Sequence, residues 1–403
     1  MKKVIVVAYD LNFFIGSECH VAASWVEVLS RYCEVYAIVD NHHKEDIERC
    51  DSLRNVKFFY VDTKRHRYEP WNKIGLGYLM LYREFIINCR RVIAAILKDG
   101  GIDVIHCLTP EGIYYFNDLY KFKVPVYVGP VGGGLKLDIR TIRAYRGQVL
   151  LYLGKSLIAS FITVIPGWRK YFRKASKIII GTKYMRPLLP SGCEGKILEI
   201  FDTMVDTRIK KRAKGSNGNK DGTVKILFAG RLTAHKGVWL AIDSVEALGN
   251  AVSARYEFHI AGSGPLSKSL REYVDRKGLS GVIKFIGHVP LEKYRAMFVD
   301  YDIFLFPALQ DPGGTVVLDA MASGLPVVCV AYGGPDISVN DEVGIKVPIG
   351  SYSHMVDGIS HGLNILIEDG DMRERKGARA VELVNERFGA DILEKKILEL
   401  YGV

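Results

Sequence analysis

Two acidic residues with glycines between them are the residues of this chain best placed for chemistry. Asp311 and Asp319 stand eight positions apart in ALQDPGGTVVLDAMASGLPVV, directly after the apolar run DIFLFP. A helix that begins near Gly314 would point its N-terminal amides at a ligand, with Asp319 about 1.5 turns along it. Carboxylates so placed can accept hydrogen bonds from the hydroxyls of a sugar or a ribose. The alternative is an Asp-Pro-Gly turn followed by a helix with one acid on its face.

A second set of residues could hold phosphate. AGRLTAHKG places Arg231 and Lys236 after Gly230, at the start of an expected helix. Two cations beside free backbone amides can bind a diphosphate and stabilise it as a leaving group, although they could also be solvated surface cations. Further along, AGSGP offers Gly262 and Gly264, where a ligand could approach the backbone.

The elements that must position these residues alternate in type along the chain. Short β-branched runs followed by amphipathic stretches predict βαβ units and parallel sheets, and a length of 403 residues predicts two domains. In parallel sheets ligands bind at the carboxyl ends of the strands. We expect strands at 4–8, 35–39, 56–61, 103–107, 124–129 and 177–181, and then at 223–230, 256–262, 282–287, 302–307 and 326–330.

The domain boundaries follow from composition. We expect a first Rossmann-like domain over residues 1–206 and a polar, glycine-rich linker over 207–222. A second Rossmann-like domain should cover 223–385, and the helical pattern of 386–403 predicts a helix that packs back on the first domain.

The motifs together resemble a known family. AGRLTAHKG, HIAGSGP, FIGHVP and FPALQDPGGTVVLDAMASGLPVV, in this order, resemble the family 4 retaining glycosyltransferases over residues 222–385. The resemblance implies the α/β GT-B fold, two Rossmann-like doubly wound parallel-sheet domains that face a cleft. The family usually has two glutamates where this chain has Asp311 and Asp319, so each acid is one methylene shorter.

The resemblance also implies roles for individual residues. Arg231 and Lys236 would contact the donor's phosphates, Asp319 its ribose, and Asp311 the transferred sugar. The remaining donor-binding residues would be Gly16, Gly230, Gly262, Gly264, Gly313, Gly314, Thr315 and Val316.

The first half should supply the acceptor side. GSE at 16–18 resembles the family's glycine-rich loop, and VGPVGGG resembles a loop of the subset that builds bacterial surface polysaccharides. Gly132 and Gly133 would let an acceptor pass closely, unless they form only a flexible turn. Glu111 is a candidate for contacting the acceptor hydroxyl. His106 ends a strand and is either a substrate-orienting catalytic residue or a core histidine.

Positive charge is concentrated in one segment. Between Lys136 and Arg186 there are twelve basic residues and one acid, beside the apolar stretch SLIASFITVIPGW. That pairing predicts peripheral attachment to an anionic membrane surface, with a plain buried helix as the alternative. The residues expected to face the membrane are Arg169, Lys170, Arg173 and Lys174.

These features predict an enzyme. We expect a retaining, metal-independent glycosyltransferase that needs no cofactor and moves a hexose-type sugar from a UDP- or GDP-sugar to a glycan or lipid-pyrophosphate-linked acceptor. A catalytically inactive GT-B scaffold is the alternative, and the charge pattern does not favour nucleic-acid binding. Seven scattered cysteines and the lack of a signal-peptide pattern predict a cytoplasmic protein without disulfides. The basic segment predicts peripheral placement on the inner face of the cell membrane.

Overall fold

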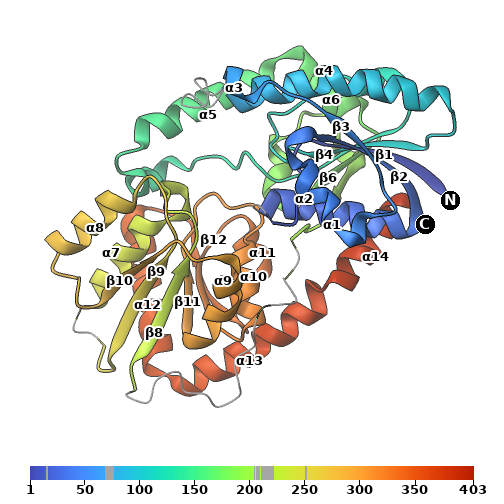
Figure 1. Ribbon diagram of the computed structural model, residues 1–403. Coiled ribbons are helices and arrows are strands. Elements are labelled where there is room, and N and C mark those ends of the chain that lie inside the picture. The colour runs from blue at the N-terminus through green and yellow to red at the C-terminus, as the bar shows by residue number, and fades with distance from the viewer. Residues whose placement is uncertain (15–16, 69–76, 204, 206–208, 210–221, 250–251) are drawn as a thin grey trace. The chain divides into compact units, whose positions relative to one another are not determined.

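The computed structural model divides the chain into two compact units (Figure 1). Unit 1 comprises residues 1–135, 153–202 and 391–403, and unit 2 comprises 136–152 and 203–390. The structure describes all residues except 15–16, 69–76, 204, 206–208, 210–221 and 250–251.

Unit 1 is built on a seven-stranded parallel sheet in the order β3-β2-β1-β4-β5-β6-β7. Its central strands are buried along most of their length because their side chains are apolar and β-branched. The strands are β1 Lys2–Ala8, β2 Cys33–Asp40, β3 Lys57–Val61, β4 Val104–Thr109, β5 Val126–Val131, β6 Lys177–Ile180 and β7 Ile197–Glu199.

Unit 2 repeats this architecture with a six-stranded parallel sheet in the order β10-β9-β8-β11-β12-β13. In both sheets the order reverses beside the first strand, β1 or β8, which is the switch point where open parallel sheets bind ligands. The strands are β8 Val224–Ala229, β9 Tyr256–Ala261, β10 Ile283–Gly287, β11 Ile303–Phe306, β12 Val327–Ala331 and β13 Gly344–Pro348.

Helices connect the strands, as parallel pairing requires. In the first half they are α1 Ser17–Tyr32, α2 Lys44–Glu48, α3 Arg65–Tyr68, α4 Gly77–Lys98, α5 Val149–Val164 and α6 Pro166–Lys174. In the second half they are α7 Val238–Leu248, α8 Ser267–Arg276, α9 Leu291–Met297, α10 Thr315–Ala322, α11 Gly334–Ser338, α12 Tyr352–Glu368, α13 Gly370–Arg387 and α14 Ala390–Tyr401.

The fold class predicted from the sequence is confirmed, and each expected strand is present. Two strands were not predicted: β7, which has only three residues, and β13, whose sequence GIKVP contains a glycine and a lysine. Residues 136–152, expected in the first domain, lie in unit 2. One reason is Arg146, whose guanidinium bonds to Asp243 at 2.6 Å and lies over the ring of Tyr352.

The C-terminal helix α14 belongs to unit 1. The hydroxyl of Tyr401 lies 2.5 Å from His106 in β4, and Glu394 bonds to Arg31 of α1 at 3.1 Å. Lys2 contacts the backbone carbonyl of Tyr401, which agrees with the neighbouring chain ends in Figure 1. The final helix therefore completes the core of the N-terminal sheet.

Candidate functional site

The centre of the candidate site in unit 2 is a pair of opposite charges. Nζ of Lys236, at the end of the short turn after β8, lies 2.5 Å from Oδ2 of Asp311 after β11. The two side chains are only 22% and 11% exposed. Burial alone would raise the pKa of the Asp311 carboxyl, but the Lys236 ammonium and a backbone amide hold that pKa below its usual value. The sequence named both residues but did not indicate that they pair.

The backbone at the start of α10 completes this arrangement. The N–H of Gly314 donates to Oδ1 of Asp311 at 3.0 Å. Gly314 has φ +65, and a Cβ there would also lie 3.1 Å from the Pro335 ring. Glycine is favoured at this position because only it adopts the left-handed conformation without strain. Thr315 and Val316 follow in the first turn of α10 and are partly exposed.

Asp319 is held by a residue that the sequence did not single out. Its Oδ2 accepts a hydrogen bond from the hydroxyl of Tyr294, on α9, at 2.5 Å, and the residue is 3% exposed. Asp319 lies one helical turn after the start of α10. The Tyr294 hydroxyl on the neighbouring helix α9 holds its carboxylate in place. No signal in LEKYRAM separates this tyrosine from an ordinary helix-surface aromatic.

The glycines after β8 and β9 bring two loops into contact. A Cβ on Gly262 would lie 1.9 Å from the carbonyl oxygen of Gly230, and one on Gly264 would lie 2.5 Å from that of Leu232. These glycines therefore allow one loop to pack on the other. This close packing fixes the backbone that carries Arg231 and Lys236.

Arg231 and His235 differ in their environments. The side chain of Arg231 is exposed. Nδ1 of His235 lies 2.6 Å from the hydroxyl of Tyr152, at the start of α5, so residues 136–152 also contact the loop after β8. The structure thus brings Lys236, Asp311 and the start of α10 together and leaves Arg231 open to solvent.

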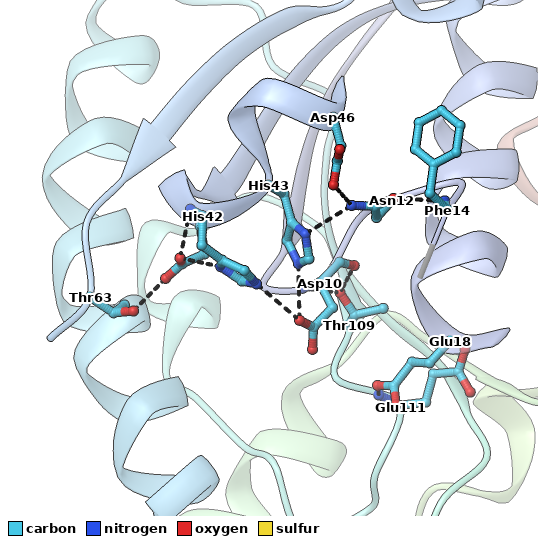
Figure 2. Close-up of polar contacts among 11 residues, drawn as sticks. Asp10, Asn12, Phe14, Glu18, His42, His43, Asp46, Thr63, Thr109 and Glu111 are labelled. Carbon is cyan, nitrogen blue, oxygen red and sulfur yellow. Dashed lines mark hydrogen bonds and ion pairs between the residues drawn. The ribbon is translucent and has the colours of Figure 1, made fainter. Parts of the chain in front are cut away.

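In unit 1 the carboxyl end of β1 carries a polar network (Figure 2). Nε2 of His43 lies 3.1 Å from Oδ1 of Asp10, and Nδ1 of the same ring lies 3.3 Å from the amide nitrogen of Asn12. That amide also donates to Asp46 at 2.7 Å, and Oδ1 of Asn12 accepts from the N–H of Phe14 at 2.7 Å. The network fixes the loop that leads to α1.

This network includes three potential metal ligands. Donor atoms of Asp10, His42 and His43 lie within 4.8 Å of one another. The Asn12 amide is oriented by Asp46 and Phe14, so it presents N–H to Nδ1 of His43. Nδ1 must then accept, and Nε2 carries the proton that it donates to Asp10. In this tautomer His43 has no lone pair at Nε2 to offer a cation, so we read the group as a hydrogen-bond network.

Glu18 and Glu111 lie close to this network and to each other (Figure 2). Oε1 of Glu18 accepts the backbone N–H of Glu111 at 2.6 Å. The carbonyl of Glu111 accepts N–H bonds from Gly132 at 3.0 Å and Gly133 at 3.3 Å. The expected acceptor-side residues Glu111, Gly132 and Gly133 are therefore brought together, with the two glycine amides directed at the protein's own backbone. Gly16 lies outside the described residues.

His106 occupies the core of unit 1. It is 0% exposed, Nδ1 lies 2.5 Å from the hydroxyl of Tyr401, and Nε2 lies 2.6 Å from the carbonyl oxygen of Gly129. Burial lowers its pKa to about 4, against the Gly129 hydrogen bond, which raises it. Both ring nitrogens are occupied, so the geometry fits the core interpretation and not the catalytic one.

The basic segment combines charge with exposed apolar side chains. On α5, Leu157 and Phe161 are 72% and 69% exposed. On α6, buried Trp168, Tyr171 and Phe172 anchor the helix. The exposed face of α6 carries Arg169, Lys170, Arg173 and Lys174. In the described part of the chain no single helix is long and apolar enough to cross a membrane, although α5 and α6, bent by 66°, pass that test as a pair.

The C-terminal part of the sequence matches a protein family. Residues 209–382 fit the family of glycosyl transferases group 1. This match contains the loops after β8, β9 and β11, and hence the Lys236–Asp311 pair and Asp319. The match therefore lies within unit 2 and covers less than half of the chain.

Curated relatives are similar to this chain over part of its length. An uncharacterized glycosyltransferase of Methanocaldococcus jannaschii is 29% identical over 204 residues, 50% of this chain and 51% of that protein. A glycosyltransferase of Salmonella typhimurium named for colanic acid biosynthesis is 26% identical over 244 residues, 58% of each protein. The chain thus spans between half and three fifths of the length of these relatives.

Solved structures resemble the whole chain in fold. A sucrose-phosphate synthase of Thermosynechococcus elongatus aligns with a TM-score of 0.70 at 14% identity, covering 100% of this chain and 98% of that one. HepE of Anabaena, in complex with UDP and glucose, aligns with a TM-score of 0.62 at 16% identity, covering 100% of both chains. The two parallel-sheet units form the GT-B fold.

Proposed function

We propose that this protein is a retaining, metal-independent glycosyltransferase of family 4 that transfers a hexose-type sugar from a nucleotide-diphosphate sugar. The observation that carries the proposal is the buried Lys236–Asp311 pair at the start of α10, with Asp319 a turn further along. It combines a cation for a phosphate, a carboxylate for a sugar and the N-terminus of a helix in one place. The family match over the same residues supports it.

The donor would bind to unit 2 through charge and hydrogen bonds. Lys236 and the exposed Arg231 supply positive charge for the diphosphate, which in other enzymes a divalent cation supplies. Asp319, oriented by Tyr294, would accept the ribose hydroxyls. HepE, a structural neighbour, was solved with UDP and glucose, and this supports a nucleotide sugar as donor.

Catalysis would consist of stabilising the leaving group. As the bond to the sugar breaks, negative charge develops on the diphosphate, and Lys236 with Arg231 lowers the energy of that state. Asp311 would hold a sugar hydroxyl through the carboxylate that Lys236 and Gly314 already orient. The acceptor hydroxyl would attack from the face that the diphosphate leaves, so the anomeric configuration is retained.

The test is nucleoside diphosphate release. Wild-type protein should release UDP or GDP from a nucleotide sugar in the presence of EDTA, and Lys236→Ala should release at least tenfold less. If the wild-type protein releases no more nucleoside diphosphate than Lys236→Ala with every donor tested, the proposed enzyme activity is refuted and an inactive scaffold is favoured. The geometry of Lys236, Asp311 and Asp319 does not favour that scaffold, because a cation and two carboxylates suited to a donor lie along one end of α10.

The acceptor is proposed to be a glycan or a lipid-pyrophosphate-linked glycan reached at a membrane surface. Exposed Leu157 and Phe161 on α5 precede the cations of α6, a combination that binds anionic lipid. Flotation with phosphatidylglycerol vesicles tests this surface. Reversing the charges of Arg169, Lys170, Arg173 and Lys174 should release the protein, whereas equal flotation of this variant would contradict the proposal.

A matched control reverses four exposed cations outside the basic segment. Their side chains are at least 48% exposed, and ion pairs of side chains this exposed contribute little to stability. Flotation of this control should equal that of wild type. The four residues are Lys44, Arg49, Arg54 and Lys268.

A further inference from the structure

Three acidic side chains of unit 1 converge at the carboxyl edge of its sheet. We call Glu18, Glu111 and Asp202 the acidic cluster. Glu18 lies in the first turn of α1, Glu111 follows β4 and Asp202 follows β7. Glu18 and Glu111 are joined by the 2.6 Å bond to the Glu111 amide, and their side chains lie side by side in Figure 2. Asp202 reaches the same edge beside β6, where a Cβ on Gly181 would lie 3.3 Å from its Oδ1.

Among the described residues, the charges that act most strongly on Glu18 and Glu111 are of their own sign. Burial raises the pKa of Glu18 to about 7, opposed by the bond from the Glu111 amide and aided by Asp10 and Asp202. Burial, with Asp202 and Glu18, also raises the pKa of Glu111 well above its ordinary value. Cys19 and Tyr115 also lie near Glu18 and are neutral at pH 7 because burial raises the pKa of each.

One oxygen of the cluster lacks a hydrogen-bond donor. Oε1 of Glu111 is shielded from solvent and has no partner among the described residues. A buried polar atom in this state destabilises the fold, and a ligand that donates to it removes that cost. A hydroxyl could make this bond. A hydroxyl would leave the ionised forms of Glu18 and Glu111 disfavoured, whereas a cation would stabilise them.

A primary ammonium group meets both requirements. It carries one positive charge and three N–H donors, enough to serve two or three carboxylates at once. Asp10 does not compete for it, because the Asp10 carboxylate already accepts from Nε2 of His43 at 3.1 Å. The acidic cluster therefore has the charge and the unpaired Glu111 acceptor oxygen that an amine site requires.

We propose that the acidic cluster binds the protonated primary amine of an amino sugar or aminocyclitol, and that such a compound is the acceptor or the part of it next to the reacting hydroxyl. The inference rests on the proposed function, because it gives a substrate class to that transfer reaction. The amine anchors the ring on unit 1 through Glu18 and Glu111. Its own N-acetyl derivative, which has no charge, would be rejected.

Calorimetric titration of the full-length protein tests the site. The probes are 6-amino-6-deoxyglucose, glucosamine and 2-deoxystreptamine, each paired with its N-acetyl derivative, with glucose as a neutral reference. We expect at least one amine to bind ten times more tightly than its acetylated form at pH 7. Equal affinity within every pair, or tighter binding of glucose, would overturn the proposal.

Variants assign the binding to these residues. Glu18→Gln keeps an oxygen to accept the Glu111 amide, and Glu111→Gln keeps the side-chain size, so both should fold, which thermal unfolding checks. Each should weaken amine binding at least tenfold. Exposed Glu48→Gln on α2 is the control and should bind as wild type does. Amine preference that persists in the Glu18→Gln/Glu111→Gln double variant would refute the assignment.

Proton release gives a readout that a structural role would not produce. An ammonium beside Glu18 favours its ionised form, so binding at pH 7 should release a proton and the heat should differ between phosphate and Tris buffers. Heats that do not depend on the buffer would count against the site. Nucleotide binding to the wild-type protein is measured separately, so failure of the donor site and failure of the amine site are distinguishable.

Discussion

Removal of the Lys236 ammonium is the perturbation whose consequences the structure defines most fully. Lys236→Met keeps much of the side-chain volume and removes the cation beside the Asp311 carboxylate, which is 11% exposed and keeps the hydrogen bond from the Gly314 amide. Breaking a buried ion pair from one side costs about 3–5 kcal/mol. Because Lys236 itself is 22% exposed and water can reach the pair, we expect about 2–3 kcal/mol at pH 7.5.

The loss of stability in Lys236→Met should depend on pH in a defined direction. In the wild type the pKa of Asp311 lies below its ordinary value, so the stability from this group is present at neutral pH and is lost as pH falls below about 4. In Lys236→Met burial remains without the cation, so the pKa rises above its ordinary value and stability is lost as pH rises above about 4. The difference between the two proteins should therefore shrink as pH falls from 7.5 toward 4.

Urea unfolding at pH 4.5, 6 and 7.5 measures this difference, and nucleotide titration measures binding. Nucleotide affinity should fall by about 10- to 100-fold, the value of a hydrogen bond to a charged group. Lys236→Met/Asp311→Asn should recover most of the lost stability but not the affinity. Lys346→Met is the matched control, because it breaks a pair of similar exposure with Asp336 in unit 2 and should leave affinity unchanged. A constant stability difference across pH, or undiminished affinity, would refute the reasoning.

Three further changes have defined outcomes. Tyr294→Phe removes the hydroxyl on Asp319 and should raise the donor KM about five- to tenfold with little change in unfolding; an unchanged KM would separate Asp319 from donor binding. Because the folded pKa of Glu18 is about 7, ionising Glu18 should cost the wild type at most about 3 kcal/mol of stability between pH 4.5 and 7, and Glu18→Gln should remove this loss. Equal changes in urea-unfolding free energy with pH in both proteins would contradict that pKa. Leu157→Asp/Phe161→Asp should abolish vesicle flotation but leave nucleotide release in solution unchanged, and retained flotation would exclude α5 from the lipid contact.

The sequence predicted the fold because its strands are marked by composition alone. Apolar β-branched runs such as VIVVA and DIFLFP can only be buried between helices, and both became central strands. It missed β13, whose glycine and lysine weaken the pattern, and it could not assign residues 136–152 to unit 2. That assignment depends on contacts such as Arg146 with Asp243, between residues 97 positions apart.

The candidate site was predictable where a motif carries the chemistry. Lys236, Asp311 and the glycines around α10 stand in loops whose spacing indicates a binding site. Tyr294 was not predictable, because its role depends on the packing of α9 beside α10.

The acceptor side illustrates the same limit. His106 ends a strand, and only the structure shows that Tyr401, 295 positions away, occupies its Nδ1. Asp202 has no local motif, and its nearness to Glu18 and Glu111 follows from the parallel order of the sheet.

Calorimetric titration of UDP and GDP into the wild-type protein, once with EDTA and once with Mg²⁺, tests most directly whether side chains of unit 2 hold the diphosphate. The account predicts that one nucleotide binds with the same Kd in both buffers and that Arg231→Ala/Lys236→Ala abolishes the heat. Binding that requires Mg²⁺, or that survives in the double variant, would contradict it.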